Sequence, residues 1–226
     1  MSGILYIVAT PIGNLRDVTL RAIDTLKKAD LIACEDTRHT RKLTTHYSIE
    51  TRLISYFEYN KFKKSKYIIG LLKEGKSVAL VSDAGTPGVS DPGYRLIKEA
   101  IANSINVTIL PGPSAIISSL VVSGLPTDRF IFEGFLPNKS AARRKRLESF
   151  KDEKRTIVFY ESPHRLVKCL NDMLEIFGNI NIVCIRELTK KFEEIKRASL
   201  EELISYFQTK RPRGEFVILA NSRAKR

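Results

Sequence analysis

Two adjacent carboxylates, Glu35 and Asp36, follow an apolar segment that we expect to form a buried strand over residues 29–34. Catalytic groups of α/β proteins gather beyond the carboxyl ends of parallel strands. A carboxylate held there can take a proton from a hydroxyl as a general base. The alternative is structural: Asp36 caps the next helix and Glu35 forms an ion pair with Arg38. Glu35 and Asp36 are therefore our catalytic candidates, with that structural role left open.

Three loops rich in glycine and proline follow other expected strands, at residues 10–15, 82–93 and 111–115. Such loops fix the path of the backbone and let it approach a ligand closely. Any one of them could be only a tight turn. Together at one sheet edge, with the twelve residues of the second loop including two acids, they predict a ligand pocket.

The chain carries 38 Lys and Arg against 25 Asp and Glu, a net charge of +13 over 226 residues. This excess indicates a polyanionic partner, either nucleic acid or an anionic membrane surface. A single basic run is usually a solvated face, but several favour contacts with a phosphate backbone. The candidate RNA-binding residues are Lys61, Lys63, Lys64, Arg143, Arg144 and Arg146, and the C-terminus adds Arg223, Lys225 and Arg226.

Several classes of protein are disfavoured by what the sequence lacks. The three widely spaced cysteines form no disulfide framework, so we expect a reducing cytoplasm. The three histidines show no metal-ligand spacing, so no metal is expected. No apolar run approaches the roughly 18 residues of a membrane span. The N-terminus has no charge before its apolar stretch, which argues against a signal peptide.

The hydrophobic pattern alternates between strand and helix periods. Strands are expected at 4–9, 29–34, 77–82, 106–110, 130–135, 155–160, 180–186, 192–198 and 215–220. Helices are expected from Thr19 to about 27 and at 36–45, 59–74, 91–101, 114–122, 140–150, 163–177 and 200–207. This predicts an α/β fold with mostly parallel sheets flanked by helices. Gly124 and Pro126 interrupt the pattern, so we expect domains at 1–122 and 123–226.

Six motifs occur in a fixed order, at residues 5–15, 34–38, 82–87, 111–115, 159–165 and 213–217. Together they resemble the ribosomal RNA small subunit methyltransferase I family, which has the tetrapyrrole methylase fold. That family methylates the ribose 2′-hydroxyl of a cytidine in the decoding centre of 16S rRNA. The resemblance covers essentially the whole chain.

The resemblance implies two α/β domains with S-adenosylmethionine in the cleft between them, and a homodimer. Its partner would be 16S rRNA within the assembled small subunit, although naked rRNA remains open as the substrate. Glu35 takes the place of the candidate base, with Asp36 beside it. The cofactor positions carried over are Pro11, Asp83, Ala84, Gly85, Val89, Pro113, Ser114, Ala115, Tyr160, Glu161, Glu215 and Phe216.

Two departures from the tetrapyrrole enzymes favour an RNA substrate. The surface is long and basic, and residues 83–87 replace the Gly-Asp-Pro turn of those enzymes. Two other readings stay open. A methyltransferase for a small tetrapyrrole or a protein side chain predicts a compact acid- or arginine-lined pocket and weak RNA affinity. A basic RNA-binding or ribosome-assembly module without catalysis predicts RNA binding that ignores S-adenosylmethionine.

Overall fold

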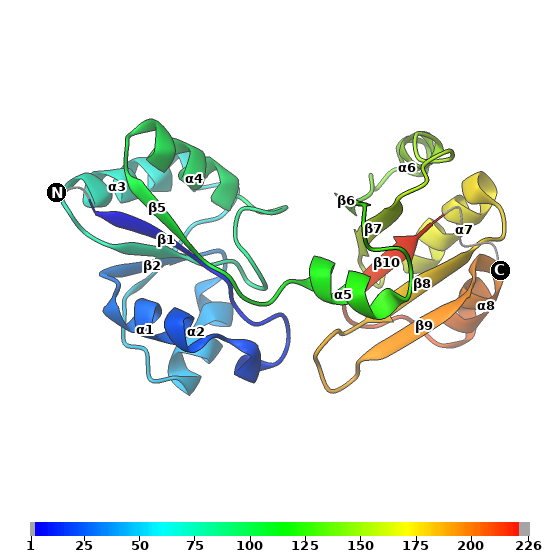
Figure 1. The fold of residues 1–226 in the computed structure, drawn as a ribbon, viewed down its shortest axis with the longest axis horizontal. Helices are drawn as coiled ribbons and strands as arrows, with labels where there is room; N and C mark the ends of the chain where they lie inside the picture. The colour runs from blue at the N-terminus through cyan, green and yellow to red at the C-terminus, as the bar shows by residue number, and fades with distance from the viewer. Residues whose placement is uncertain (1–2, 222–226) are drawn as a thin grey trace. The chain divides into compact units, whose positions relative to one another are not determined.

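The computed structural model describes residues 3–221, so the C-terminal cluster of Arg223, Lys225 and Arg226 lies outside the described residues. The chain divides into two compact units, Met1–Ser114 and Ala115–Arg226 (Figure 1). Each unit holds one five-stranded sheet. Within residues 3–221, none of the helices combines the length and apolar character that a membrane span requires.

The sheet of the first unit is parallel throughout, with the strand order β3-β2-β4-β1-β5. Its strands are β1 (Ile4–Val8), β2 (Leu31–Cys34), β3 (Leu53–Ser55), β4 (Val78–Leu80) and β5 (Asn106–Leu110). The helices are the short 3-10 helix η1 (Leu15–Asp17), α1 (Leu20–Lys28), α2 (Thr37–His46), α3 (Lys61–Lys73) and α4 (Gly93–Ala102).

Helices cover both faces of this sheet because successive side chains of a strand point to opposite faces. Leu5 and Ile7 of β1 pack with Ile68 of α3 in one apolar cluster, which α4 completes. Val8 packs on the other face with Leu26 of α1. Because all five strands are parallel, their carboxyl ends lie at one edge of the sheet. The loops that leave these ends can form a site there.

The second unit has a mixed sheet with the order β6-β7-β10-β8-β9. Its elements are α5 (Ala115–Ser123), β6 (Phe130–Phe135), α6 (Ser140–Glu148), β7 (Thr156–Glu161), α7 (Leu166–Phe177), β8 (Asn181–Arg186), β9 (Glu194–Ser199), α8 (Leu200–Thr209) and β10 (Phe216–Ala220). Only β6 and β7 pair in parallel, and the other three pairings are antiparallel. The prediction of mostly parallel sheets is confirmed for the first unit and wrong for the second.

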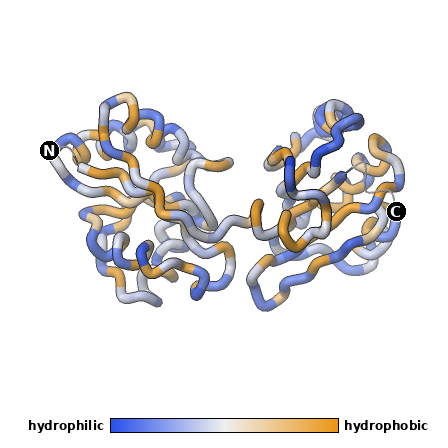
Figure 2. Tube along the Cα trace, viewed as in Figure 1, coloured by the Kyte–Doolittle hydropathy of each residue, from blue (hydrophilic) through white to orange (hydrophobic). Residues whose placement is uncertain are grey.

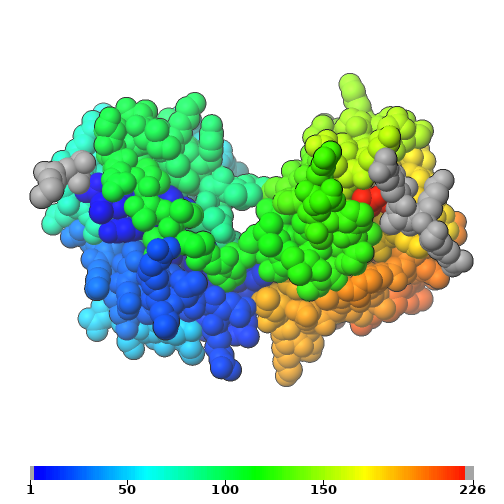
Figure 3. All heavy atoms as spheres, viewed as in Figure 1, coloured from blue at the N-terminus to red at the C-terminus, as the bar shows by residue number. Residues whose placement is uncertain are grey.

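For β8 and β9 the reason is that a turn joins them rather than a helix, and a short turn connects antiparallel neighbours. This turn, orange in Figure 3, projects from the second unit. Along the trace, hydrophobic residues gather in the strands, whereas α6 is strongly hydrophilic (Figure 2). Helices α6, α7 and α8 cover one face of the sheet through a single large apolar cluster.

Helix α5 covers the other face of the second sheet. Its Leu120 packs with Val158 of β7 and Val217 of β10. This packing ties α5 to the second unit, so the division falls after Ser114 and not after residue 122 as the sequence pattern predicted. The break at Gly124 is a turn inside the second unit.

Candidate active site

The three glycine- and proline-rich loops converge at the carboxyl edge of the first sheet. Thr10 and Gly85 form an antiparallel bridge, with N···O distances of 2.9 and 3.0 Å. The Thr10 hydroxyl also donates to the carbonyl of Ser82 at 3.1 Å. A Cβ atom placed on Gly85 would lie 3.5 Å from both Ile12 Cγ2 and the Pro113 carbonyl oxygen. Gly85 is therefore the point where all three loops meet.

Glu35 is a half-buried carboxylate at the same edge, directly after β2. Desolvation by the surrounding protein is the largest cause, and together with the negative charges of Asp91 and Asp83 it raises the pKa of Glu35 to about 7. A carboxyl group with this pKa is partly ionised at neutral pH. That is the range in which a side chain works well as a general base.

Asp83 and Asp91, in the loop after β4, accept hydrogen bonds from backbone N–H groups. Asp83 Oδ1 accepts a hydrogen bond from the backbone of Asp36 at 3.1 Å. Asp91 accepts from the backbone of Gly88 at 2.9 Å and from that of Gly93 at 2.7 Å. Burial raises the pKa of Asp91. These two acids thus set the loop conformation and the electrostatic environment of Glu35.

Asp36 caps a helix and forms an ion pair, in contrast to Glu35. Its Oδ1 accepts the backbone N–H of Arg38 at 2.8 Å and so caps α2, while the Arg38 guanidinium lies 2.8 Å from Oδ2. The hydrogen bonds from Arg38 lower the pKa of Asp36 to about 2. The part of the structural alternative in which Asp36 caps the helix is therefore correct. The ion pair differs from the one expected, since Arg38 pairs with Asp36 and not with Glu35. Of the two candidates, Glu35 alone has the environment of a base.

The remaining candidates of the three loops differ in exposure and in the unit to which they belong. Pro11 is buried, whereas Ala84 and Val89 are exposed. Ser114 closes the first unit and Ala115 begins α5 in the second. Within the described residues, no group of three or more His, Cys, Asp or Glu is arranged to hold a metal ion.

In the second unit, the register of β7 and β10 pairs Glu161 with Phe216. The Phe216 ring is buried in the core, 5.5 Å from the ring of Phe207 between centroids, so its side chain is not available to a ligand. Glu161 is buried as well, with Oε1 accepting from the backbone of Ser162 at 2.8 Å and lying 3.2 Å from Arg165 Nε. A contact between Phe216 and the cofactor therefore has to be made by the backbone of this residue and not by its ring.

Tyr160 lies on β7, and Glu215 immediately precedes β10. Burial, aided by the negative charge of Glu215, raises the pKa of Tyr160 to about 12. Tyr160 makes an edge-to-face contact with Phe132, with 5.0 Å between ring centroids. Glu215 is exposed and forms an ion pair with Lys190 at 2.8 Å. Tyr160 is thus a neutral phenol at physiological pH.

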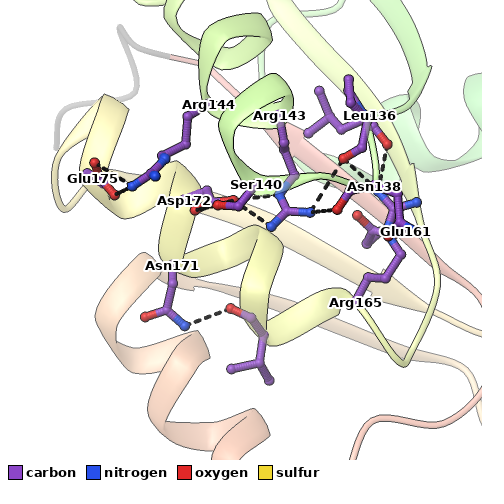
Figure 4. A network of polar contacts seen from close by, with 12 residues as sticks. Leu136, Asn138, Ser140, Arg143, Arg144, Glu161, Arg165, Asn171, Asp172 and Glu175 are labelled. Atoms are coloured by element: carbon purple, nitrogen blue, oxygen red, sulfur yellow. Dashed lines mark hydrogen bonds and ion pairs between the residues drawn. The ribbon is translucent and has the colours of Figure 1, made fainter.

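Arg143 does not belong to an RNA-binding surface. It is 3% exposed, and its Nε donates to Asp172 Oδ2 at 2.6 Å (Figure 4). Its Nη1 donates to the carbonyl of Asn138 at 3.1 Å, and Ser140 donates to Asp172 at 3.0 Å. The prediction for Arg143 is wrong because this arginine forms a buried ion pair between α6 and α7.

Most of the other predicted RNA-binding cations are also paired within their own unit. The pairs are Arg144 with Glu175 at 2.7 Å, Arg146 with Glu133 at 2.5 Å, and Lys61 with Glu58. Among residues 3–221, Lys63 and Lys64 have no carboxylate partner, and Lys64 Nζ lies 6.0 Å from the Tyr67 ring centroid. Local pairing reduces the positive charge that these clusters offer to RNA.

A basic groove lies between η1 and α2, and the sequence analysis did not single it out. Its volume is about 680 Å³, and it is lined by Leu15, Thr37, Arg38, Arg41, Lys42, Thr45 and His46. The available signal was a run of basic residues without an acid inside one expected helix, immediately after the two candidate catalytic acids.

Comparisons with known proteins identify the family of the chain. Residues 4–204 match the family described as Tetrapyrrole (Corrin/Porphyrin) Methylases. Ribosomal RNA small subunit methyltransferase I of Halalkalibacterium halodurans is 52% identical over 217 residues, which cover 96% of this chain and 75% of that protein. The protein of the same name from Thermotoga maritima is 50% identical over 221 residues, or 98% of this chain and 99% of that one.

Solved structures share the fold at lower identity. Cobalt precorrin-4 methyltransferase superimposes with a TM-score of 0.75 at 18% identity, covering 96% of this chain and 94% of that one. Uroporphyrin-III C-methyltransferase of Thermus thermophilus, solved with S-adenosylhomocysteine, gives 0.68 at 18% identity, with coverage of 97% and 98%. By its matched residues and its full-length relatives, the chain belongs to the tetrapyrrole methylase family, and within it to the ribosomal RNA small subunit methyltransferase I family.

Proposed function

We propose that this protein transfers the methyl group of S-adenosylmethionine to the ribose 2′-hydroxyl of a cytidine in the decoding centre of 16S rRNA. The observation that carries the proposal is Glu35, whose pKa of about 7 suits it to take a proton from a weakly nucleophilic hydroxyl. The names of the relatives support ribosomal RNA of the small subunit as the substrate.

The loops of the first unit fit S-adenosylmethionine by their chemistry. Asp83 uses one carboxylate oxygen for the backbone of Asp36, and within the described residues its other oxygen accepts no hydrogen bond. A free carboxylate oxygen is an acceptor for ribose hydroxyls or an ammonium group. The Pro113 carbonyl oxygen lies 3.5 Å from the point where a Cβ atom on Gly85 would stand. Because Gly85 has no side chain, a ligand can approach the backbone of both residues closely. We propose that these three residues hold the cofactor.

In the proposed mechanism, S-adenosylmethionine supplies an already activated methyl group. Glu35 would accept the proton of the 2′-hydroxyl and end the reaction protonated, as a carbon–oxygen bond replaces the bond between the methyl carbon and the sulfonium sulfur. Asp91 and Asp83 raise the proton affinity of Glu35 through their negative charges. Asp36 fixes the start of α2 and with it the backbone next to Glu35. The cytidine has to be presented outside its stack.

Two measurements test the proposal together. Titration calorimetry with S-adenosylmethionine is expected to show one binding site. Transfer of a labelled methyl group to assembled small subunits that lack the modification, followed by digestion to nucleosides, is expected to give 2′-O-methylcytidine. Label on a base, or on an added tetrapyrrole and not on the subunit, would contradict the proposal. Parallel reactions with naked 16S rRNA identify the preferred form of the substrate.

Gly85 gives a prediction for the cofactor site. Its φ of +79° belongs to the left-handed region that favours glycine, and holding another residue there costs about 1–3 kcal/mol. Gly85→Val is therefore expected to weaken S-adenosylmethionine binding about tenfold or more, measured by calorimetry. Gly70→Ala in α3 is the matched control, because a Cβ there meets nothing within 4 Å. Equal affinities of the two variants would contradict the assigned site.

Asp36 gives a second prediction, which separates it from Glu35. Asparagine caps helices about as well as aspartate, so Asp36→Asn should preserve the start of α2. Because Arg38 holds the pKa of Asp36 at about 2, this carboxylate is a poor proton acceptor. Turnover of Asp36→Asn in single-turnover methyl transfer is expected to stay within a few-fold of wild type. A loss of a hundredfold would instead make Asp36 the base.

We also propose that the protein acts in the cytoplasm as a homodimer. Its three cysteines are all free and buried, which agrees with a reducing compartment. The dimer is proposed from the family resemblance, and sedimentation equilibrium of the purified protein tests it directly.

A further inference from the structure

We infer that the groove between η1 and α2 binds the phosphate backbone of the substrate RNA beside the ribose that is methylated. This inference rests on the proposed function. The groove contains the cationic side chains of Arg38, Arg41 and Lys42. Thr37 and Thr45 add hydroxyl donors. Arginine, lysine and hydroxyl groups are the donors that proteins use for phosphate oxygens.

Two of the three cations of the groove, Arg41 and Lys42, are available because α2 carries no acid of its own. Its ten residues include two arginines, one lysine and two histidines, and no aspartate or glutamate. Arg41 and Lys42 are exposed, and neither has a carboxylate partner within the part of the chain that the structure describes. Arg38 pairs with Asp36. The clusters at Arg144 and Arg146, by contrast, are each neutralised by a glutamate.

The groove also lies beside the proposed catalytic carboxylate. Helix α2 starts at Thr37, two residues after Glu35. A rise of 1.5 Å per residue places Arg41 and Lys42 about 6–8 Å along the helix axis from Thr37. An RNA strand whose ribose approaches Glu35 therefore brings a neighbouring phosphate within reach of Arg41 and Lys42.

Hydrogen bonds join the two walls of the groove and cap one of them. The Tyr47 hydroxyl donates to the carbonyl of Leu15 at 2.8 Å, which holds η1 against the end of α2. Asn14 accepts the backbone N–H of Arg16 at 3.1 Å and caps η1. The loop after β1 thus forms one wall and α2 the other, and both leave the carboxyl edge of the sheet where Glu35 lies.

The double variant Arg41→Gln/Lys42→Gln tests the inference. Binding of transcribed 16S rRNA is measured against salt concentration, and methyl transfer is measured on small subunits that lack the modification. Loss of two phosphate contacts should reduce the slope of log K against log salt by about 1.4. We expect kcat/KM to fall at least tenfold, chiefly through KM. The affinity for S-adenosylmethionine should stay unchanged.

The matched control is Lys27→Gln/Lys28→Gln, which removes the same charge from the same unit. Both lysines are exposed and lie in the last turn of α1, just before β2 begins, at the opposite edge of the parallel sheet. This control is expected to keep the wild-type salt slope and KM. Equal slopes for the two double variants would overturn the inference. If the wild-type protein binds S-adenosylmethionine but methylates no small-subunit RNA, the proposed function fails instead, and the slopes still decide whether the groove binds RNA.

Discussion

Glu35→Gln is expected to lower kcat for methyl transfer by about 10²–10⁴-fold, the usual contribution of a positioned general base. Glutamine keeps the size of the side chain and cannot accept the proton of the 2′-hydroxyl. The dissociation constant for S-adenosylmethionine should stay within a few-fold of wild type, since Glu35 is proposed to act on the hydroxyl and not on the cofactor. Single-turnover transfer to small subunits and calorimetry measure the two quantities separately. Unchanged turnover would remove Glu35 from the mechanism.

The pH dependence of the wild-type enzyme provides an independent test of the same role. Glu35 must be ionised to act as a base, and its pKa is about 7. The rate of methyl transfer is therefore expected to rise through pH 7 and to level off above it. The residual rate of Glu35→Gln should lack this rise. A wild-type rate that is already maximal at pH 5 would contradict the assignment.

A stability measurement shows whether the variant is simply misfolded. The carboxyl of Glu35 has a pKa of about 7 in the folded protein and 4.5 as its ordinary value, so the folded state binds the proton more tightly. Ionisation then costs stability as pH rises from 4.5 towards 7. Discounted for partial exposure, the cost is on the order of 1 kcal/mol. Glu35→Gln should therefore be more stable than wild type at pH 8 in urea unfolding, and no more stable at pH 4.

The features of this site that depend on neighbouring residues could be predicted from the sequence. Loops 10–15 and 82–93 were recognisable from their glycines and prolines, and the bridge between Thr10 and Gly85 shows that they meet. The capping role of Asp36 was visible as an alternative, because a cap depends only on the next few residues. The division of roles between Asp36 and Glu35 was not visible. It depends on which acid Arg38 reaches and on the distant charges of Asp91 and Asp83.

Features that depend on contacts between residues far apart in the chain could not be predicted from the sequence. Strand β3 has only three residues, too few for a period, and is defined by its pairing with β2. The antiparallel pairing of β8 with β9 and β10 requires knowing which connections are turns. Helix α5 carries the same apolar pattern whichever sheet it covers, and its contacts with the second sheet decide its unit.

Arg143 is the sharpest case of a distant partner, and it carries the second large prediction. In the sequence it stands within a basic run, but Asp172, 29 residues later, lies 2.6 Å from its Nε. Arg143→Met would leave Asp172 buried without its counter-ion, which typically costs about 3–5 kcal/mol. Urea unfolding is expected to show a loss of this size. Arg144→Gln, next to it and paired on the surface, should change stability by less than about 1 kcal/mol.

The double variant Arg143→Met/Asp172→Leu separates a structural role from an RNA contact. Replacing both members of a buried pair by apolar residues is often neutral or stabilising, so much of the lost stability should return. The salt slope for 16S rRNA binding should equal that of wild type, since a side chain that is 3% exposed offers no surface to a phosphate. A small loss of stability in Arg143→Met together with a flatter salt slope in the double variant would instead restore Arg143 to the RNA-binding surface.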